Sequence, residues 1–325
     1  MKPIMKYMSC LFAAAVTGLA AQPAMAAYPD RPIKLIVPFP AGGTTDSVAR
    51  FIAQELSDKL SQQVVVDYKA GAATIIGAEH TAKSEPDGYT LMLGTATTFT
   101  VNPILYPDLS YDPIKSFTPI GIVGTTSLAL LANKTEPAND LKTLLDEMRK
   151  TPGEYSYGSH GNGTTVHFAA EMLWSAAKVD VVHIPFKGAS PALTNLMGGQ
   201  IPISFDAVPA AATALKSGRI KAIAVTGPER SPALPDVPTV AESGFPGFAM
   251  QSWFALVAPK GLPEQVQATL ENALESAMSE PSLVEKLTNA GLEPKFEGSA
   301  DYVTRVKADI AKLEPIAKAN NITRN

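Results

Sequence analysis

The sequence has few of the side chains on which thiol chemistry, metal binding and nucleic-acid recognition depend. It contains a single cysteine, Cys10, and four histidines that show no HExxH or other ligand spacing. It also lacks the Gly-x-Ser-x-Gly elbow of many serine hydrolases, and no nucleophile stands beside a recognisable base. The net charge is −4, so no basic excess attracts a phosphate backbone. We therefore expect no catalytic residue, metal, cofactor or nucleic-acid partner.

The first 26 residues have the layout of a secretory signal peptide. Lys2 and Lys6 precede an apolar run over residues 11–21, and Ala24-Met25-Ala26 supplies a small-x-small cleavage site. A membrane anchor is the alternative, but about 11 apolar residues are well short of the roughly 20 that cross a bilayer. Cys10 precedes this run and so cannot be a lipid-attachment cysteine. We expect cleavage near Ala26 and an exported chain with no thiol and a net charge of about −6.

Short apolar strands alternate with amphipathic helices in two successive blocks. In the first block, strands are expected at residues 33–37, 64–66 and 89–93, with helices from Asp46 and at 77–83. In the second block, strands are expected at 128–132, 155–157, 181–184, 201–205 and 220–225, with helices around 141–148 and 168–174. Strands and helices that alternate in this way form mainly parallel sheets flanked by helices. The predicted fold class is α/β.

The length and the order of the segments predict two domains that share the chain's end. Around 300 mature residues exceed what one hydrophobic core usually serves. Residues 226–246 are rich in proline and glycine, which is typical of a connector. One strand at 253–258 and helices over 266–277 and 303–313 follow, which is too little sheet for a third domain. We expect one domain of residues 27–124 plus 246–325 and a second of residues 125–245, joined by two crossings and a hinge.

Two loops, one in each block, share a layout. Residues 38–46 (PFPAGGTTD) and 158–165 (GSHGNGTT) each link a strand to a helix and reach Gly-Thr-Thr at the helix start. Glycines let a ligand approach the backbone, a helix start offers unpaired N–H groups and the positive dipole end, and threonine hydroxyls add donors. The alternative is that these residues only cap helices and shape turns. Since ligands collect outside the carboxyl ends of strands in open α/β sheets, we expect two facing anion sites.

Further side chains are candidates for the cleft, each with a structural alternative. His160 and His167 flank the second loop, where each either hydrogen-bonds a carboxylate or packs. Asp46 either caps its helix or meets the ligand, and Asp206, after a strand, is placed to meet an amine or hydroxyl. Aromatic residues are either cleft walls or core. The predicted site is Phe39, Ala41, Gly42, Gly43, Thr44, Thr45, Asp46, Thr95, Ser159, His160, Gly161, Asn162, Gly163, Thr164, Thr165, Phe186, Lys187, Asp206 and Trp253.

Long motifs spread from about residue 28 to the end of the chain resemble those of one protein family. They are YPDRPI (28–33), VPFPAGGTTD (37–46), PDGYTL (86–91), YDP (111–113), YGS and GNGT (157–159 and 161–164), HIPFKG (183–188) and RSPALPDVPT (230–239). With these motifs the chain resembles the substrate-binding proteins of tripartite tricarboxylate transporters, the Bug receptors. Two segments depart from the family pattern: residues 71–77 (GAATIIG) replace a glycine-rich, Asn-containing stretch, and Phe186 stands where Tyr is common.

The resemblance implies a periplasmic binding protein of the Venus-flytrap type, expected to be monomeric. In the family, backbone and hydroxyl donors of the first loop hold the ligand's carboxylate, often through ordered waters and without an arginine. The second loop and the region of Asp206 close over the ligand's other end. The changes at residues 71–77 are expected to reshape the cleft.

We therefore expect a non-enzymatic protein that captures a small carboxylate and delivers it to integral membrane permease subunits. The ligand is expected to be a dicarboxylate, an acidic amino acid or an aromatic carboxylate such as terephthalate. A citrate-like ligand is less favoured. Two alternatives stay open, an exported solute sensor for a signalling partner and a secreted hydrolase.

Overall fold

A computed structural model describes residues 28–319 and 321–323. The predicted signal peptide therefore lies outside the described residues. Within them, ten strands form one strongly curved sheet in the order β2-β1-β3-β9-β4-β7-β5-β6, and β8 and β10 both pair with β4. The strands are β1 (Ile33–Val37), β2 (Val64–Tyr68), β3 (Thr90–Thr95), β4 (Phe117–Asn133), β5 (Ser156–Ser159), β6 (Val182–Pro185), β7 (Ile203–Ala207), β8 (Ile220–Val225), β9 (Gln251–Pro259) and β10 (Glu293–Glu297).

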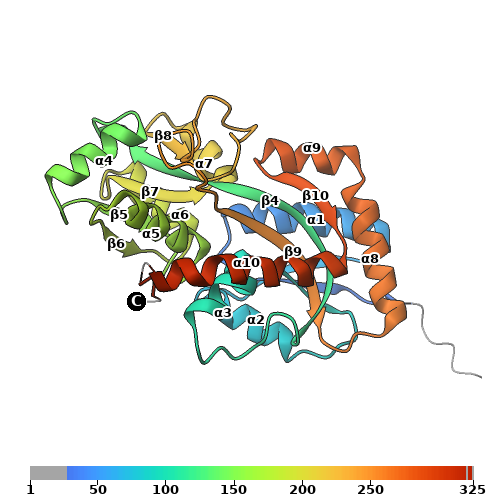
Figure 1. The fold of residues 1–325 in the computed structure, drawn as a ribbon. Helices are drawn as coiled ribbons and strands as arrows, with labels where there is room; N and C mark the ends of the chain where they lie inside the picture. The colour runs from blue at the N-terminus through green and yellow to red at the C-terminus, as the bar shows by residue number, and fades with distance from the viewer. Residues whose placement is uncertain (1–27, 320, 324–325) are drawn as a thin grey trace, which may run out of the picture.

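Helices pack around both ends of the sheet (Figure 1). We call the region between the two ends, where β4 and β9 cross, the waist. They are α1 (Thr44–Leu60), α2 (Ile75–Ala82), the π-helix η1 (Thr97–Val101), α3 (Asn102–Leu105), α4 (Leu141–Lys150), α5 (Thr165–Ala177), α6 (Ala189–Met197), α7 (Val208–Leu215), α8 (Glu264–Met278), α9 (Pro281–Asn289) and α10 (Ser299–Ala319). No helix among the described residues is long and apolar enough to cross a membrane.

The sheet divides into two lobes because β4 changes partners along its length. Residues 117–127 of β4 pair with β9, whereas residues 128–133 pair with β7 and β8. Lobe 1 contains β1–β3 and β9, and lobe 2 contains β5–β8. The strands β1, β2 and β3 pair in parallel, as do β5, β6 and β7, as predicted, whereas β4 and β9 pair antiparallel with their neighbours. These antiparallel strands carry the chain across the waist.

Each lobe has its own apolar core. In lobe 1, α1 turns Val48, Ile52 and Leu56 onto the sheet, where they are fully buried among residues of β1 and β3. In lobe 2, the core gathers residues of α4, α5, β5 and β7. The end of α10 crosses the waist, since Leu313, Ala317 and Ile322 belong to the lobe 2 core. The predicted domain limits stay a prediction, and α10 packs across them.

Candidate functional site

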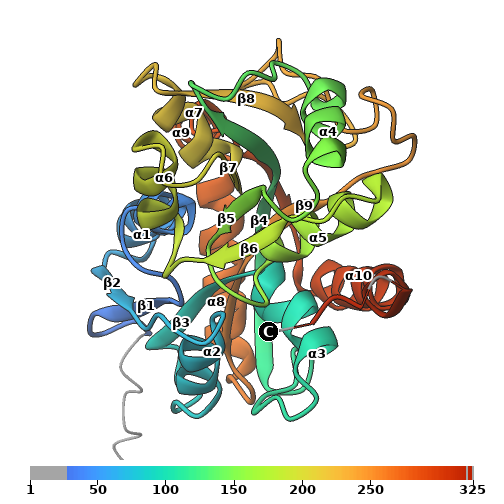
Figure 2. The same cartoon turned by 90° about the vertical axis from the view of Figure 1, so that its left-hand side faces the viewer.

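The two predicted loops lie on opposite lobes and meet. Pro40 of the first loop lies close to Gly188, which precedes α6, and Gly163 of the second loop lies against Tyr106 of lobe 1. The Thr165 N–H at the start of α5 donates to Thr97 Oγ1 across the waist (2.9 Å), and the two hydroxyl oxygens are 2.8 Å apart. Figure 2 shows α6 above α1 in this arrangement. The structure is therefore one in which the lobes touch.

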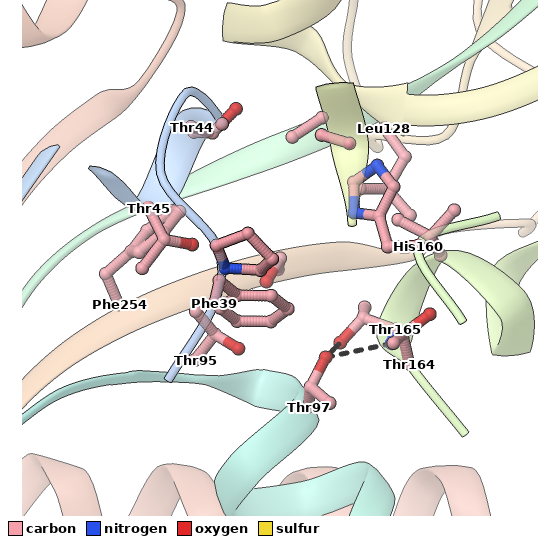
Figure 3. Close-up of a pocket in the computed structure, with 16 residues that line it drawn as sticks. Phe39, Thr44, Thr45, Thr95, Thr97, Leu128, His160, Thr164, Thr165 and Phe254 are labelled. Atoms are coloured by element: carbon pink, nitrogen blue, oxygen red, sulfur yellow. Dashed lines mark hydrogen bonds between the residues drawn. The ribbon is translucent and has the colours of Figure 1, made fainter. Parts of the chain in front are cut away.

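A small inner chamber of about 50 Å³ lies between the loops. Figure 3 shows side chains from both lobes around it. The predicted residues that line it are Phe39, Gly43, Thr44, Thr45 and Thr95 from lobe 1, and His160, Thr164 and Thr165 from lobe 2. Sequence reasoning missed Pro40, Thr97, Leu128, Val166, Ala189, Ala207, Ser252 and Phe254. Pro40 lies within the first loop and Val166 directly follows the second, whereas the other six belong to elements distant in sequence from both loops, so no local motif pointed to those six.

A larger outer chamber of about 770 Å³ adjoins the inner one and shares Phe39, Pro40, His160 and Thr164 with it. Gly161, Asn162, Phe186 and Lys187, all predicted, line this outer chamber. Residues 71–77, which depart from the family pattern, were not among the predicted site residues. Four of them, Gly71, Ala72, Ala73 and Thr74, are part of this wall.

The inner chamber has polar atoms that find no partner in the protein. Thr44 Oγ1 and Thr95 Oγ1 are buried without a hydrogen bond among the described residues, as is Asn162 Oδ1 in the outer wall. A buried polar group left unpaired costs about 1–3 kcal/mol, so such groups normally meet a ligand or water. No side chain caps the start of α1 at Gly43, which leaves the first N–H groups of that helix free to meet an anion.

His160 stands at the junction of the two chambers beside a buried acid. Its Nε2 lies 3.0 Å from Asp206 Oδ2, but the two atoms are not aligned for a hydrogen bond. Asp206 is fully buried at the end of β7, and its Oδ1 accepts the Ala207 N–H. Asp206 itself does not line either chamber, so the prediction that it meets the ligand directly does not fit this structure.

Asp46 acts within its own lobe and not on the cleft. Its Oδ2 accepts the Gly42 N–H at 2.8 Å, and its Oδ1 accepts from Arg50 and from the Tyr68 hydroxyl. Burial raises the pKa of the Asp46 carboxyl, but the bonds from Tyr68, Gly42 and Arg50 outweigh it and hold this pKa below its usual value. This carboxylate therefore has a structural part, since it fixes the turn before α1, but it does not cap the N–H groups of the helix itself.

Trp253 is a core residue, and the prediction that it walls the cleft is wrong. Its neighbours on β9, Ser252 and Phe254, line the inner chamber, so the alternation of side chains along a strand turns Trp253 to the opposite face. There it is 1% exposed, stacks on Phe99 and donates to Asp309. Four other predicted residues, Ala41, Gly42, Ser159 and Gly163, also lie outside both chamber walls.

Behind the second loop lies a buried cluster that sequence reasoning did not foresee. Ser159 Oγ is 2.6 Å from His183 Nε2, and the ring of His183 stacks on that of His167 at 4.2 Å. The Gly163 N–H donates to His167 Nδ1, so this ring holds the loop that carries Thr164. A serine and a base are therefore adjacent, but Ser159 is fully buried and faces neither chamber. The pair supports the loop and is not placed to attack a ligand.

Above about pH 4 both rings are expected to be neutral in the folded protein. Burial lowers the pKa of His167 to about 3, and the neighbouring His183 adds to the effect; burial lowers the pKa of His183 to about 4. In the unfolded chain both titrate near 6.5. Between about pH 4 and 6.5 the unfolded state therefore binds more protons than the folded state.

Stability is consequently expected to be complete above pH 6.5 and to fall as the pH drops toward 4. The slope is roughly 1.4 kcal/mol per pH unit from buried His167, with a smaller share from His183, which water partly screens. Urea unfolding at pH 7.5 and pH 5 measures it. The double variant His167→Asn, His183→Gln keeps acceptors in place and should lose less stability on acidification, whereas His80→Asn, at an exposed position, should behave like the wild type. An equal loss of stability on acidification in the wild type and both variants would contradict the assignment of this pH dependence to His167 and His183.

Comparison with known proteins gives a consistent picture. The sequence model of one protein family, described as tripartite tricarboxylate transporter family receptor, matches residues 48–322 of this chain. The periplasmic binding protein BugD is 34% identical in sequence with a TM-score of 0.87, and the match covers 92% of this chain and all of BugD.

Two further solved structures contain carboxylates. Rpa4515 of R. palustris, solved with adipate, is 34% identical with a TM-score of 0.88 over 91% of this chain and 99% of that one. MatC from Rhodopseudomonas palustris, solved with bound malate, is 33% identical with a TM-score of 0.84 over 89% and 99%. With its two lobes, its facing loops and these matches, the chain belongs to the tripartite tricarboxylate transporter receptor family of periplasmic solute-binding proteins, which includes the Bug proteins.

Proposed function

We propose that this protein captures a small carboxylate between its lobes, outside the cytoplasm, and delivers it to the permease subunits of a tripartite-type transporter. The observation that carries the proposal is the pair of buried, unpartnered hydroxyls, Thr44 Oγ1 and Thr95 Oγ1, beside the uncapped start of α1 in the inner chamber. Hydroxyl and N–H donors with a positive helix end suit the oxygen atoms of a carboxylate. Relatives solved with adipate and malate support the same ligand class.

Capture and delivery of a ligand require no change in its covalent bonds. Ligand binding would hold the lobes together, because contacts with both loops exist only when the cleft is shut. The lining offers no Asp, Glu, Arg or Lys in the inner chamber, so neutral donors carry the recognition. This arrangement fits a dicarboxylate, an acidic amino acid or an aromatic carboxylate, each of which presents a carboxylate at one end.

A thermal-shift screen of residues 27–325 against a carboxylate panel tests the proposal. A ligand at 100 times its dissociation constant adds about 2.7 kcal/mol to stability, which is a readily measured rise in melting temperature. The matching carboxamides are the control, since they keep the shape of each acid and lose its charge. A panel that includes adipate, malate, glutamate and terephthalate but raises the melting temperature with none of them would contradict carboxylate capture.

A further inference from the structure

The sizes of the two chambers constrain the shape of the ligand. The inner chamber, at about 50 Å³, is less than a tenth of the size of the outer chamber, at about 770 Å³, so it suits the carboxylate end of a ligand and not the body of a larger acid. The rest of any larger acid must extend past the residues that both chambers share and into the outer chamber. The outer chamber therefore meets the body of the ligand.

The wall of the outer chamber is mostly apolar. Phe39 approaches it from lobe 1 and Phe186 from lobe 2, and proline and alanine residues fill much of the remainder. Lys187 is the one residue of this lining among Asp, Glu, Lys and Arg, and it is exposed to solvent. A ligand hydroxyl that packs against Phe39, Phe186 or the alanines would lose its water without gaining a partner, because the unpaired polar atoms of this wall among the described residues, His160 Nε2 and Asn162 Oδ1, belong to the second loop.

One segment of this wall keeps an unfavourable backbone. Ala72, Ala73 and Thr74 are consecutive non-glycine residues at φ values of 47°, 48° and 78°, in the left-handed region. Glycine would adopt this backbone without strain, so two alanine methyl groups are kept in the wall against the local preference of the chain.

Hydrogen bonds from lobe 1 hold the segment in this shape. Thr74 Oγ1 accepts from Thr98 Oγ1 (3.0 Å) and from Asn102 Nδ2 (3.2 Å), and Asn102 Nδ2 also donates to the Ala73 carbonyl (2.7 Å). Tyr111 in turn donates to the Thr98 carbonyl. The segment is thus fixed from η1 and α3, and the wall presents a defined surface.

We propose that Ala72 and Ala73 determine specificity, selecting carboxylates with an unsubstituted hydrocarbon body, either an aromatic ring or an unbranched chain, over hydroxylated acids. The two methyl groups, with Phe39 and Phe186, make the outer chamber an apolar slot for that body. Lys187 at the mouth gives a second carboxylate, where the ligand has one, a solvent-exposed counter-charge. This inference rests on the proposed function and narrows its ligand class.

Calorimetric titration of residues 27–325 with adipate, terephthalate and malate tests the preference for acids with an unsubstituted hydrocarbon body. Adipate or terephthalate should bind at least tenfold more tightly than malate. Malate binding as tightly as either apolar acid would overturn the inference and leave carboxylate capture standing. Failure of all three acids would overturn the inference, whereas the thermal-shift panel, which includes glutamate, decides carboxylate capture separately.

The double variant Ala72→Gly, Ala73→Gly tests whether these two alanines cause the preference. Each lost methyl contact should weaken the tighter apolar acid about fourfold, or about 15-fold together, while malate binding changes little. The melting temperature should stay the same or rise, because glycine relieves the backbone. Ser61→Gly is the matched control: Ser61 also has a positive φ, of 51°, but ends α1 away from the cleft, so its affinity should be unchanged. Wild-type affinity in the double variant would overturn the role of Ala72 and Ala73.

Discussion

Replacing Gly43 with leucine is expected to abolish carboxylate binding while the fold survives. Gly43 precedes the first turn of α1 and lines the inner chamber. Its φ of −102° suits any residue, and an added Cβ would lie 3.5 Å from the Ala189 Cβ, an ordinary contact. Because Gly43 lines the chamber of about 50 Å³, we expect the rest of a leucine side chain to enter it and take the place of the carboxylate. We expect at least a hundredfold loss of affinity with a melting temperature within a few degrees of the wild type.

Gly298→Leu provides the control for this substitution. An added Cβ at Gly298 meets nothing within 4 Å, and the residue lies far from both chambers, before α10. Its affinity should equal that of the wild type in the same titration. If Gly43→Leu binds the ligand normally, the first loop is not the carboxylate site.

Replacing Thr97 with valine should weaken ligand binding by about 5- to 150-fold while the apolar core of each lobe stays intact. Thr97 Oγ1 accepts the Thr165 N–H across the waist, and both residues are buried, at 2% and 3% exposure. In the shut form valine leaves that N–H without a partner, at a cost of about 1–3 kcal/mol, whereas water satisfies it when the lobes part. The substitution therefore disfavours closure, and the dissociation constant rises by the same factor.

Titration calorimetry together with small-angle scattering of the ligand-saturated protein would measure both effects. Thr100→Val is the matched variant on the same π-helix, because the Thr100 hydroxyl donates to the Ala96 carbonyl within lobe 1. It should reduce stability slightly and leave affinity alone. An affinity loss of equal size in both variants would show that the Thr97–Thr165 contact has no special part in closure.

The regular elements followed from apolar periodicity where that signal was strong. β1 and β8 have the predicted bounds, and α4 covers the predicted face at Leu141, Leu144, Leu145 and Met148. The first half of β4 was missed because Pro119, Gly121 and Gly124 interrupt its apolar pattern, and they coincide with irregular register against β9. β10 was missed because its residues, EPKFE, are charged and only partly buried.

The candidate site was predictable where a loop between a strand and a helix has the sequence Gly-Thr-Thr at the helix start. Gly43, Thr44 and Thr45 at one helix start, and Thr164 and Thr165 at the other, line the inner chamber, and their contact with a ligand stays a prediction. Ser252 and Phe254 could not be found, because only the pairing of β9 with β3 and β4 brings them to the chamber. Trp253 was named as an aromatic candidate for the cleft wall with the core as the alternative, and strand alternation buries it in the core on the other face.

What the amino-acid sequence determined by itself was local: which segments pair as strands or wind as helices, and which two loops expose backbone donors at a helix start. These features depend on residues that are neighbours along the chain, so periodicity and turn chemistry reveal them. Tertiary structure alone decided how the loops face one another, that His160 stands beside Asp206, and that Ala72 and Ala73 wall the outer chamber. Those relations arise from the packing of distant segments, which carries no signature in any one of them.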